Sequence, residues 1–264
     1  MEYQVSSASI ICMVITCIGC FAIPLALCFL IHKKGASLKA FIVGCAIFMI
    51  FVIGLEGVAV RAILGSSMGE TIENNIWYYA VFGGLMAGLF EEIGRFIAFR
   101  TILKNNTDND YNALMYGAGH GGAEAMIIVG SAMISNIMVS NMVNSGNIAA
   151  VTEGLTGDQL VQIQSQIEQL ATLPAVTFLL SLVERISAIL LHMALSVIVW
   201  FAAKRGSVML VVAIVIHAAV DAVTLILSQS GINTFKMESV IMALSLATAF
   251  YAWAIWRKYS TMEE

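Results

Sequence analysis

Apolar residues occur along this chain in long, nearly uninterrupted runs that short polar connections separate. Seven of these runs exceed the roughly 20 residues that a helix needs to cross the hydrocarbon core of a bilayer. We therefore predict an all-α, polytopic integral membrane helix bundle that forms a single transmembrane domain over residues 1–264. The predicted spans cover residues 7–31, 39–62, 76–100, 112–140, 174–202, 206–228 and 237–257.

The composition supports this prediction and excludes a soluble domain. Hydrophobic residues make up 59% of the 264 residues and charged residues only 11%, whereas an ordinary soluble domain carries about 25% charged residues. The sequence has no basic surface of the kind that binds nucleic acid. We expect membrane lipids as partners, no nucleic acid, and localisation in a bacterial plasma membrane.

The basic residues predict the orientation, because cytoplasmic loops carry an excess of Lys and Arg. If the seven spans alternate in direction, only Arg61 and Lys236 fall on the outer side. This distribution predicts an N-out, C-in topology. The basic residues on the predicted cytoplasmic side are Lys33, Lys34, Lys39, Arg100, Lys104, Lys204, Arg205, Arg257 and Lys258.

Two regions depart from the pattern of spans and short loops. The fourth predicted span is long and rich in glycine, and we expect it to be broken or partly re-entrant. The longest connection, residues 141–173, faces outward in the predicted topology and should form an amphipathic surface helix. A surface cap and a gate for substrate are both open as its role. Its apolar residues at helical spacing are Leu160, Ile163, Ile167 and Leu170.

Ionisable residues inside spans are costly and usually functional. Span two contains Glu56 alone, near its outer end, and we assign it no role. In the other spans the histidines and most carboxylates lie roughly 12–18 Å from the cytoplasmic end, at a rise of about 1.5 Å per residue. The ionisable residues are Glu91, Glu92 and Arg95 in span three, His120 and Glu124 in span four, Glu184, Arg185 and His192 in span five, and His217 and Asp221 in span six.

Spacing within the spans directs these side chains toward one another. Glycine and alanine dominate residues 117–125, and small residues let neighbouring helices approach closely. We therefore expect four spans to direct their ionisable groups into one cavity. Three pairs are four residues apart and so share one helix face: Glu91 with Arg95, His120 with Glu124, and His217 with Asp221.

A zinc ion fits this set of side chains. Zinc binds His nitrogen and carboxylate oxygen, and catalytic sites keep one position open for a water whose pKa falls to about 7. A nearby glutamate can accept the proton and pass it to a leaving amine. Three other functions are open: a proton- or ion-coupled transporter, an electron carrier with haem between paired histidines, and a non-catalytic membrane scaffold.

Four short motifs carry the ionisable residues, and together they resemble those of a known family. The motifs EEIGR (91–95), GHGGAEA (119–125), Glu184-Arg185 with His192, and HAAVD (217–221) look like those of the YhfC family of intramembrane metalloproteases. This family is related to the CAAX-protease and bacteriocin-processing (CPBP) group and to the PrsW group. The resemblance covers about residues 80–225.

The resemblance implies a zinc-dependent endopeptidase that cleaves a peptide or membrane-protein substrate near the cytoplasmic side of the membrane. Glu91 or Glu92 would be catalytic and would activate the water, and both match the motif. Glu124 occupies the functional position of the second motif, where His120 competes with it as a metal ligand. The other implied metal ligands are His192, His217 and Asp221, and the implied supporting residues are Arg95, Glu184 and Arg185.

Overall fold

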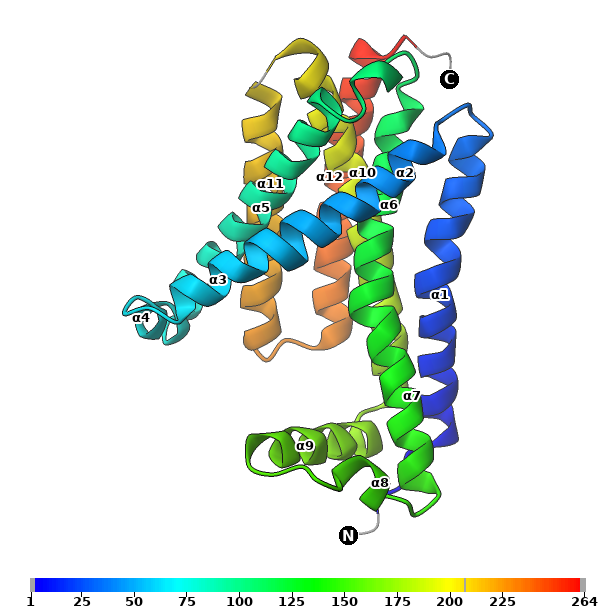
Figure 1. Ribbon diagram of the computed structural model, residues 1–264, viewed down its shortest axis with the longest axis vertical. Helices are drawn as coiled ribbons and strands as arrows, with labels where there is room; N and C mark the ends of the chain where they lie inside the picture. Colours follow the sequence, from blue (N-terminus) through cyan, green and yellow to red (C-terminus); the bar gives the residue numbers. More distant parts are fainter. Residues whose placement is uncertain (1–2, 207, 262–264) are drawn as a thin grey trace. The chain divides into compact units, whose positions relative to one another are not determined.

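The computed structural model describes residues 3–206 and 208–261, which form helices joined by turns and short loops (Figure 1). Each predicted span corresponds to one helix or to consecutive helical segments, which confirms the all-α prediction. In chain order the segments are α1 (Ser7–His32), α2 (Leu38–Ile47), η1 (Phe48–Glu56), α3 (Gly57–Leu64), α4 (Gly69–Glu73), α5 (Ile76–Arg100), η2 (Lys104–Asn106), α6 (Tyr111–Glu124), η3 (Ala125–Gly130), α7 (Ser131–Asn144), α8 (Ala149–Thr152), α9 (Asp158–Thr172), α10 (Ala175–Arg205), α11 (Val208–Gln229) and α12 (Thr234–Tyr259).

Within the described residues, six helical stretches are long and apolar enough to cross a membrane. They confirm a polytopic membrane protein. The remaining predicted span is also helical, since it forms α5 with 25 residues, and it contains three charged residues, Glu91, Glu92 and Arg95. The N-out, C-in orientation stays a prediction. The six stretches are Ser7–His32, Leu38–Leu64, Tyr111–Asn144, Ala175–Arg205, Val208–Gln229 and Thr234–Tyr259.

The fourth predicted span is continuous, so the expectation of a broken or re-entrant segment is wrong. Its 34 residues from Tyr111 to Asn144 run through α6, the π-helical segment η3 and α7 without a loop. A glycine inside a helix costs only about 1 kcal/mol. Close packing against neighbouring helices offsets this cost, as the contacts of Gly119 described below illustrate.

The described residues group into two compact units, which we describe separately. The first unit contains Met1–Ala22 and Ala125–Arg185, and the second contains Ile23–Glu124 and Ile186–Glu264. The prediction of a single transmembrane domain stays a prediction.

In the first unit, α9 is the amphipathic helix expected in the 141–173 connection. Its residues Ile167 and Leu170 are buried. The side-chain nitrogen of Gln166 donates a hydrogen bond of 2.8 Å to Oδ1 of Asn136 in α7, and α9 runs across the direction of α7 (Figure 1). The predicted helix is therefore confirmed, whereas its role as cap or gate stays open.

In the second unit, glycines allow two pairs of helices to pack backbone against backbone. A Cβ on Gly84 of α5 would lie 2.2 Å from the carbonyl oxygen of Ala218 in α11, and one on Gly119 of α6 would lie 2.1 Å from that of Phe41 in α2. Any larger residue would push these helices apart, as expected where membrane helices approach closely. The contacts hold α5 against α11, and therefore hold together two of the helices that carry the ionisable residues.

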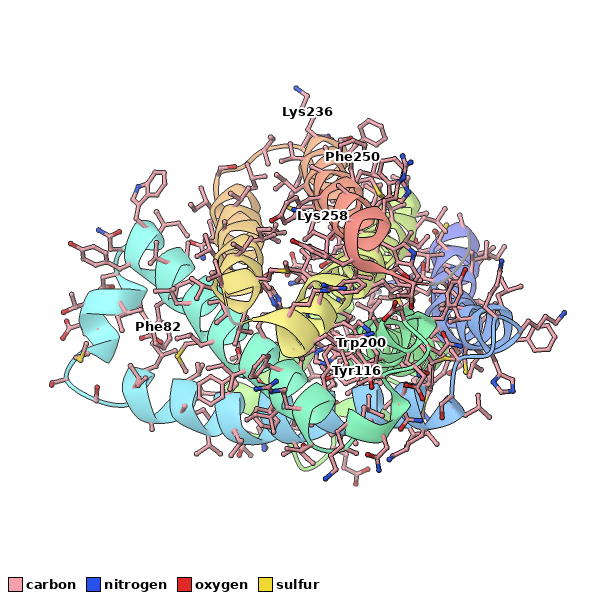
Figure 2. The ribbon with its side chains drawn as sticks, turned by 90° about the horizontal axis from the view of Figure 1, so that it is seen from above. Phe82, Tyr116, Trp200, Lys236, Phe250 and Lys258 are labelled. Atoms are coloured by element: carbon pink, nitrogen blue, oxygen red, sulfur yellow. The ribbon has the colours of Figure 1, made fainter. Side chains whose placement is uncertain are left out.

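An aromatic cluster fills one end of the second unit. The ring of Phe99 packs edge to face against Tyr116 and Trp200, with centroids 4.7 and 5.0 Å apart. Figure 2 shows Tyr116 and Trp200 lying among the helices, whereas Lys236 and Phe250 point away from them. These rings join α5, α6 and α10 at the ends next to the loop of residues 101–110.

Asp110 closes this end of the unit with a set of hydrogen bonds. Its carboxylate accepts from Trp200 Nε1 at 2.7 Å, from Lys204 Nζ at 2.8 Å and from Ser260 Oγ at 2.9 Å. Burial raises the pKa of Asp110, but the hydrogen bonds from Lys204, Trp200 and Ser260 outweigh it and hold the pKa below its usual value. The network joins the start of α6 to the ends of α10 and α12.

Candidate metal centre

Eight ionisable residues of the second unit form one connected set of side-chain contacts. They come from α5, α6, α10 and α11, the four helices whose polar residues the sequence places at similar depth. The eight residues are Glu91, Glu92, Arg95, His120, Glu124, His192, His217 and Asp221.

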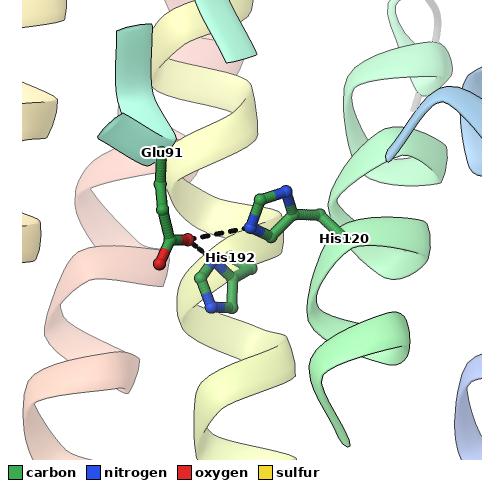
Figure 3. A group of neighbouring side chains, drawn as sticks. All are labelled: Glu91, His120 and His192. Atoms are coloured by element: carbon green, nitrogen blue, oxygen red, sulfur yellow. Dashed lines mark hydrogen bonds and ion pairs between the residues drawn. The ribbon is translucent and has the colours of Figure 1, made fainter. Parts of the chain in front are cut away.

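Three of these residues, Glu91, His120 and His192, form what we call the donor group (Figure 3). Oε2 of Glu91 lies 2.8 Å from Nε2 of His120 and 3.8 Å from Nδ1 of His192. One possible ligand atom from each residue lies within 4.8 Å of the other two. All three residues are buried. Three helices therefore bring one carboxylate and two imidazoles to a single point.

His192 is held on both sides of its ring. A guanidinium nitrogen of Arg95 lies 3.1 Å from Nδ1, and Oε2 of Glu124 lies 2.6 Å from Nε2. Because a guanidinium can only donate hydrogen bonds, Nδ1 is the acceptor and Nε2 carries the proton given to Glu124. A carboxylate on the second nitrogen commonly fixes the tautomer of a metal-binding histidine. The same Nδ1 lies 3.8 Å from Oε2 of Glu91.

The other group, Glu92, Arg95, His217 and Asp221, is called the ion-pair group, and all its members except Asp221 are buried. One guanidinium nitrogen of Arg95 donates to both oxygens of Glu92, at 2.6 and 2.5 Å. Nδ1 of His217 lies 2.7 Å from Oε1 of Glu92, and Nε2 lies 3.5 Å from Oδ2 of Asp221. The side chains of Glu92 and Arg95 are fully buried. Both oxygens of Glu92 and both nitrogens of His217 thus face groups within the ion-pair group.

The pairing of Arg95 differs from the one that helical spacing suggests. Arg95 was expected to share a face with Glu91, four residues before it, but it forms its ion pair with Glu92, three residues before it. Both spacings place side chains on adjacent parts of a helix surface. The choice depends on the neighbours from other helices, because His217 approaches Glu92 and His120 approaches Glu91.

Glu184 and Arg185, the two other expected supporting residues, are consecutive residues of α10 and form an ion pair with each other.

Glu56 lies nearer to these groups than the sequence indicates. Its Oε2 is buried and has no hydrogen-bond partner among the described residues, and Glu91 is the first of the charged groups that act on it. It ends η1, the segment in which Phe48 packs edge-on against His120 at 5.5 Å. π-Helical segments are rare and often occur at functional sites. The wider turn changes which face a residue occupies, and hydrophobic periodicity does not reveal it.

The donor group fits a divalent metal ion by its chemistry. Imidazole nitrogen and carboxylate oxygen are the donors that zinc takes in catalytic sites, where three protein ligands leave a fourth position for water or substrate. Glu124 supplies the outer carboxylate that such a site uses on a histidine ligand. The ion-pair group is less suited, because its Arg95 already neutralises Glu92.

Comparison with known proteins identifies a family and a relative of this chain. The chain matches the family described as YhfC intramembrane metalloprotease over residues 18–242. It is 33% identical over 253 residues to the uncharacterized membrane protein YhfC of Bacillus subtilis strain 168, and this alignment covers 94% of the chain and 96% of that protein. No solved structure matches the chain.

Proposed function

The chain belongs to the YhfC intramembrane metalloprotease family, and on this premise we propose that it hydrolyses peptide bonds inside the membrane with a bound zinc ion. The chain is an integral membrane protein of the bacterial plasma membrane. The observation that carries the proposal is the donor group, in which Glu91, His120 and His192 of three different helices converge.

In this proposal Glu91, His120 and His192 hold the metal. A zinc ion held there would act as a Lewis acid, lowering the pKa of a bound water and polarising the peptide carbonyl. His192 would bind through Nδ1, because its Nε2 donates to Glu124. Arg95, which lies 3.1 Å from the same Nδ1, would then keep only its contact with Glu92.

Glu124 is the proposed proton acceptor. Its side chain is 17% exposed, against 8% for Glu91 and 0% for Glu92, so it is the one of these three that water and substrate can best reach. It would take a proton from the attacking water and deliver it to the leaving amine. The sequence favoured the reverse roles, with Glu91 or Glu92 as the base and Glu124 as a ligand.

The ion-pair group is proposed to position the site. Glu92 and Arg95 join α5 to His217 of α11 through contacts that leave no oxygen of Glu92 without a donor. His217 and Asp221, which the sequence placed among the metal ligands, would hold this arrangement from α11. The proposed substrate is a peptide or a membrane protein, because the donor group lies within membrane-spanning helices. Cleavage near the cytoplasmic side would follow from the N-out, C-in orientation expected from the basic residues.

The test uses full-length protein in detergent and a mixture of synthetic single-span transmembrane peptides, with cleavage read by mass spectrometry. We expect cleavage that 1,10-phenanthroline abolishes and added zinc restores. The Glu124→Gln variant should bind zinc without cleaving, because glutamine still accepts the proton of His192 but cannot take one from water. Cleavage that continues in the chelator, or in Glu124→Gln, would contradict the proposal.

A proton-coupled transporter is the second candidate, and the connected contacts favour it. Acidic residues and histidines in such chains serve as proton relays in membranes, and here they run from Asp221 through His217 and Glu92 to Arg95, His192 and Glu124. Proteoliposomes with an internal pH dye distinguish the two candidates. Proton flux that Asp221→Asn abolishes, together with no peptide cleavage, would favour the transporter.

A further inference from the structure

Tyr116 of α6 has a buried hydroxyl group that forms no hydrogen bond with the described residues. The residue is 0% exposed, and its Oη has no hydrogen-bond partner among them. A buried hydroxyl without a partner costs free energy, so the great majority of such groups in folded proteins are paired. The hydroxyl of Tyr116 therefore points to a partner that it meets in another state of the site.

The ring of Tyr116 is held between two neighbours. Phe99 packs edge to face against it with centroids 4.7 Å apart, and His120 stacks on it at 6.1 Å with an interplanar angle of 27°. Both neighbours are buried. Tyr116 thus joins the aromatic cluster to a member of the donor group, and its hydroxyl is fixed in position. A partner for Oη has to move toward it.

Arg95 is the donor beside this hydroxyl. Its guanidinium carbon lies 6.0 Å from the ring centre of Tyr116, and it is the first of the charged groups that act on Tyr116. One terminal nitrogen of Arg95 donates to Glu92, the other lies against Nδ1 of His192, and Nε is buried without a partner in the described residues. The guanidinium can therefore exchange His192 for Tyr116 without leaving Glu92.

A metal ion on His192 would require such an exchange. The contact of Arg95 with Nδ1 and a metal bond to Nδ1 exclude each other, because both use the single lone pair of that nitrogen. The histidine lies among buried groups (Figure 3), so the released guanidinium nitrogen cannot simply turn to water. A buried donor without an acceptor would oppose metal binding.

We propose that Tyr116 is a positioning residue that accepts this guanidinium nitrogen when His192 binds the metal. The inference rests on the proposed function, since it concerns the same zinc site. The hydroxyl acts through Arg95: it draws the guanidinium away from Nδ1 and frees the lone pair for the metal.

Tyr116→Phe tests the proposal, because it removes the hydroxyl and keeps the ring contacts. Full-length protein in detergent is depleted of metal, and its zinc affinity is measured by competition with a fluorescent zinc chelator. We expect the affinity to fall about 10-fold or more, since the variant loses a hydrogen bond from a charged donor. The midpoint of denaturant unfolding of the metal-depleted protein should not fall, because Oη has no hydrogen bond to lose while Arg95 holds Nδ1. A fall in both quantities would show a merely structural role and would overturn the proposal.

Two further variants separate the action through Arg95 from a general effect of the tyrosine. Tyr111→Phe changes a tyrosine of the same helix that packs against Trp256 at 5.4 Å, and it should leave the zinc affinity unchanged. Lysine at position 95 has one side-chain nitrogen, which stays with Glu92. In an Arg95→Lys background, Tyr116→Phe should therefore change the zinc affinity by less than about twofold. An equal loss in both backgrounds would overturn the proposal.

The wild type separates a failure of this inference from a failure of the proposed function. If wild type and Tyr116→Phe bind zinc with the same affinity, the inference is wrong and the proposed zinc site stands. If the metal-depleted wild type takes up no zinc, the proposed function and the inference are both wrong.

Discussion

Glu91 and Glu92 are consecutive residues of α5, and their carboxylates meet different kinds of neighbours. Glu92 is enclosed by Arg95 and His217, with donors on both oxygens. Glu91 faces His120 and His192, whose ring nitrogens can lose a proton to solvent and then donate a lone pair to a metal ion. A guanidinium cannot do so, because it stays protonated.

The different neighbours of Glu91 and Glu92 distinguish a carboxylate that is available for metal binding from a structural one. A buried ion pair whose partners are all satisfied holds helices together, and removal of one partner leaves an uncompensated charge. A carboxylate beside imidazoles keeps ligand atoms that a divalent ion can take.

Glu124→Gln should lower the rate of peptide cleavage by about 10²–10⁴-fold, the usual contribution of a general base. Metal content should stay unchanged, because glutamine keeps an acceptor for Nε2 of His192. Initial rates on a cleaved peptide, with elemental analysis of the same preparation, measure both quantities. Glu153→Gln in the first unit is the matched control and should keep the full rate. A parallel loss of zinc in Glu124→Gln would assign Glu124 to the ligands instead.

Arg95→Met should lower the free energy of unfolding by about 3–5 kcal/mol, because it leaves Glu92 buried without its counter-charge. Glu91→Gln should lower the free energy of unfolding by only about 1 kcal/mol, since glutamine retains a hydrogen bond to His120. Denaturant unfolding of both variants in one detergent gives the comparison. Equal losses in the two variants would show that Glu91 is as much a structural residue as Glu92.

Asp110→Asn should lower the free energy of unfolding by about 2 kcal/mol at pH 7, because it weakens hydrogen bonds to a charged acceptor. The folded-state pKa of Asp110 lies below its usual value of 3.8. Its contribution is therefore fully present above about pH 4 and is lost as the pH falls through the lowered pKa. Unfolding at pH 7 and pH 3 should show a wild-type advantage that shrinks at pH 3. An advantage that grows at pH 3 would contradict this assignment.

Glu56→Gln should have the smallest effect, a gain in stability of up to about 1 kcal/mol. The variant replaces the carboxyl group of Glu56, which lies near Glu91 and whose Oε2 has no partner in the described residues, with an amide that cannot ionise. Thermal unfolding together with metal content provides the measurement. Loss of zinc in this variant would place Glu56 among the metal ligands. The metal site would then include a carboxylate outside the donor group.

The helices could be predicted from the sequence, because long apolar runs leave a membrane-spanning chain few alternatives to helix. The predicted span 76–100 coincides with α5. The histidines of three spans meet the glutamates of α5 because all of them lie at a similar distance from the cytoplasmic ends of their spans. These histidines are His120, His192 and His217. Depth depends only on position along a helix, so the sequence contains it.

The choice of partner among these residues could not be predicted. Arg95 is three residues from Glu92 and four from Glu91, and helical spacing permits either contact. Neighbouring helices decide, through close approaches such as that of Gly84 to Ala218. The π-helical segments η1 and η3 also change which side of the helix the following residues occupy. Hydrophobic periodicity in the sequence does not predict such segments.

The zinc content of the purified protein tests whether Glu91, rather than Glu92, is the metal-binding carboxylate. Wild type, Glu91→Gln and Glu92→Gln are prepared in parallel and analysed by elemental mass spectrometry. We expect near-stoichiometric zinc in wild type and in Glu92→Gln, and its loss in Glu91→Gln. Zinc that persists in Glu91→Gln but is lost in Glu92→Gln would contradict it, and would move the metal from the donor group to the ion-pair group.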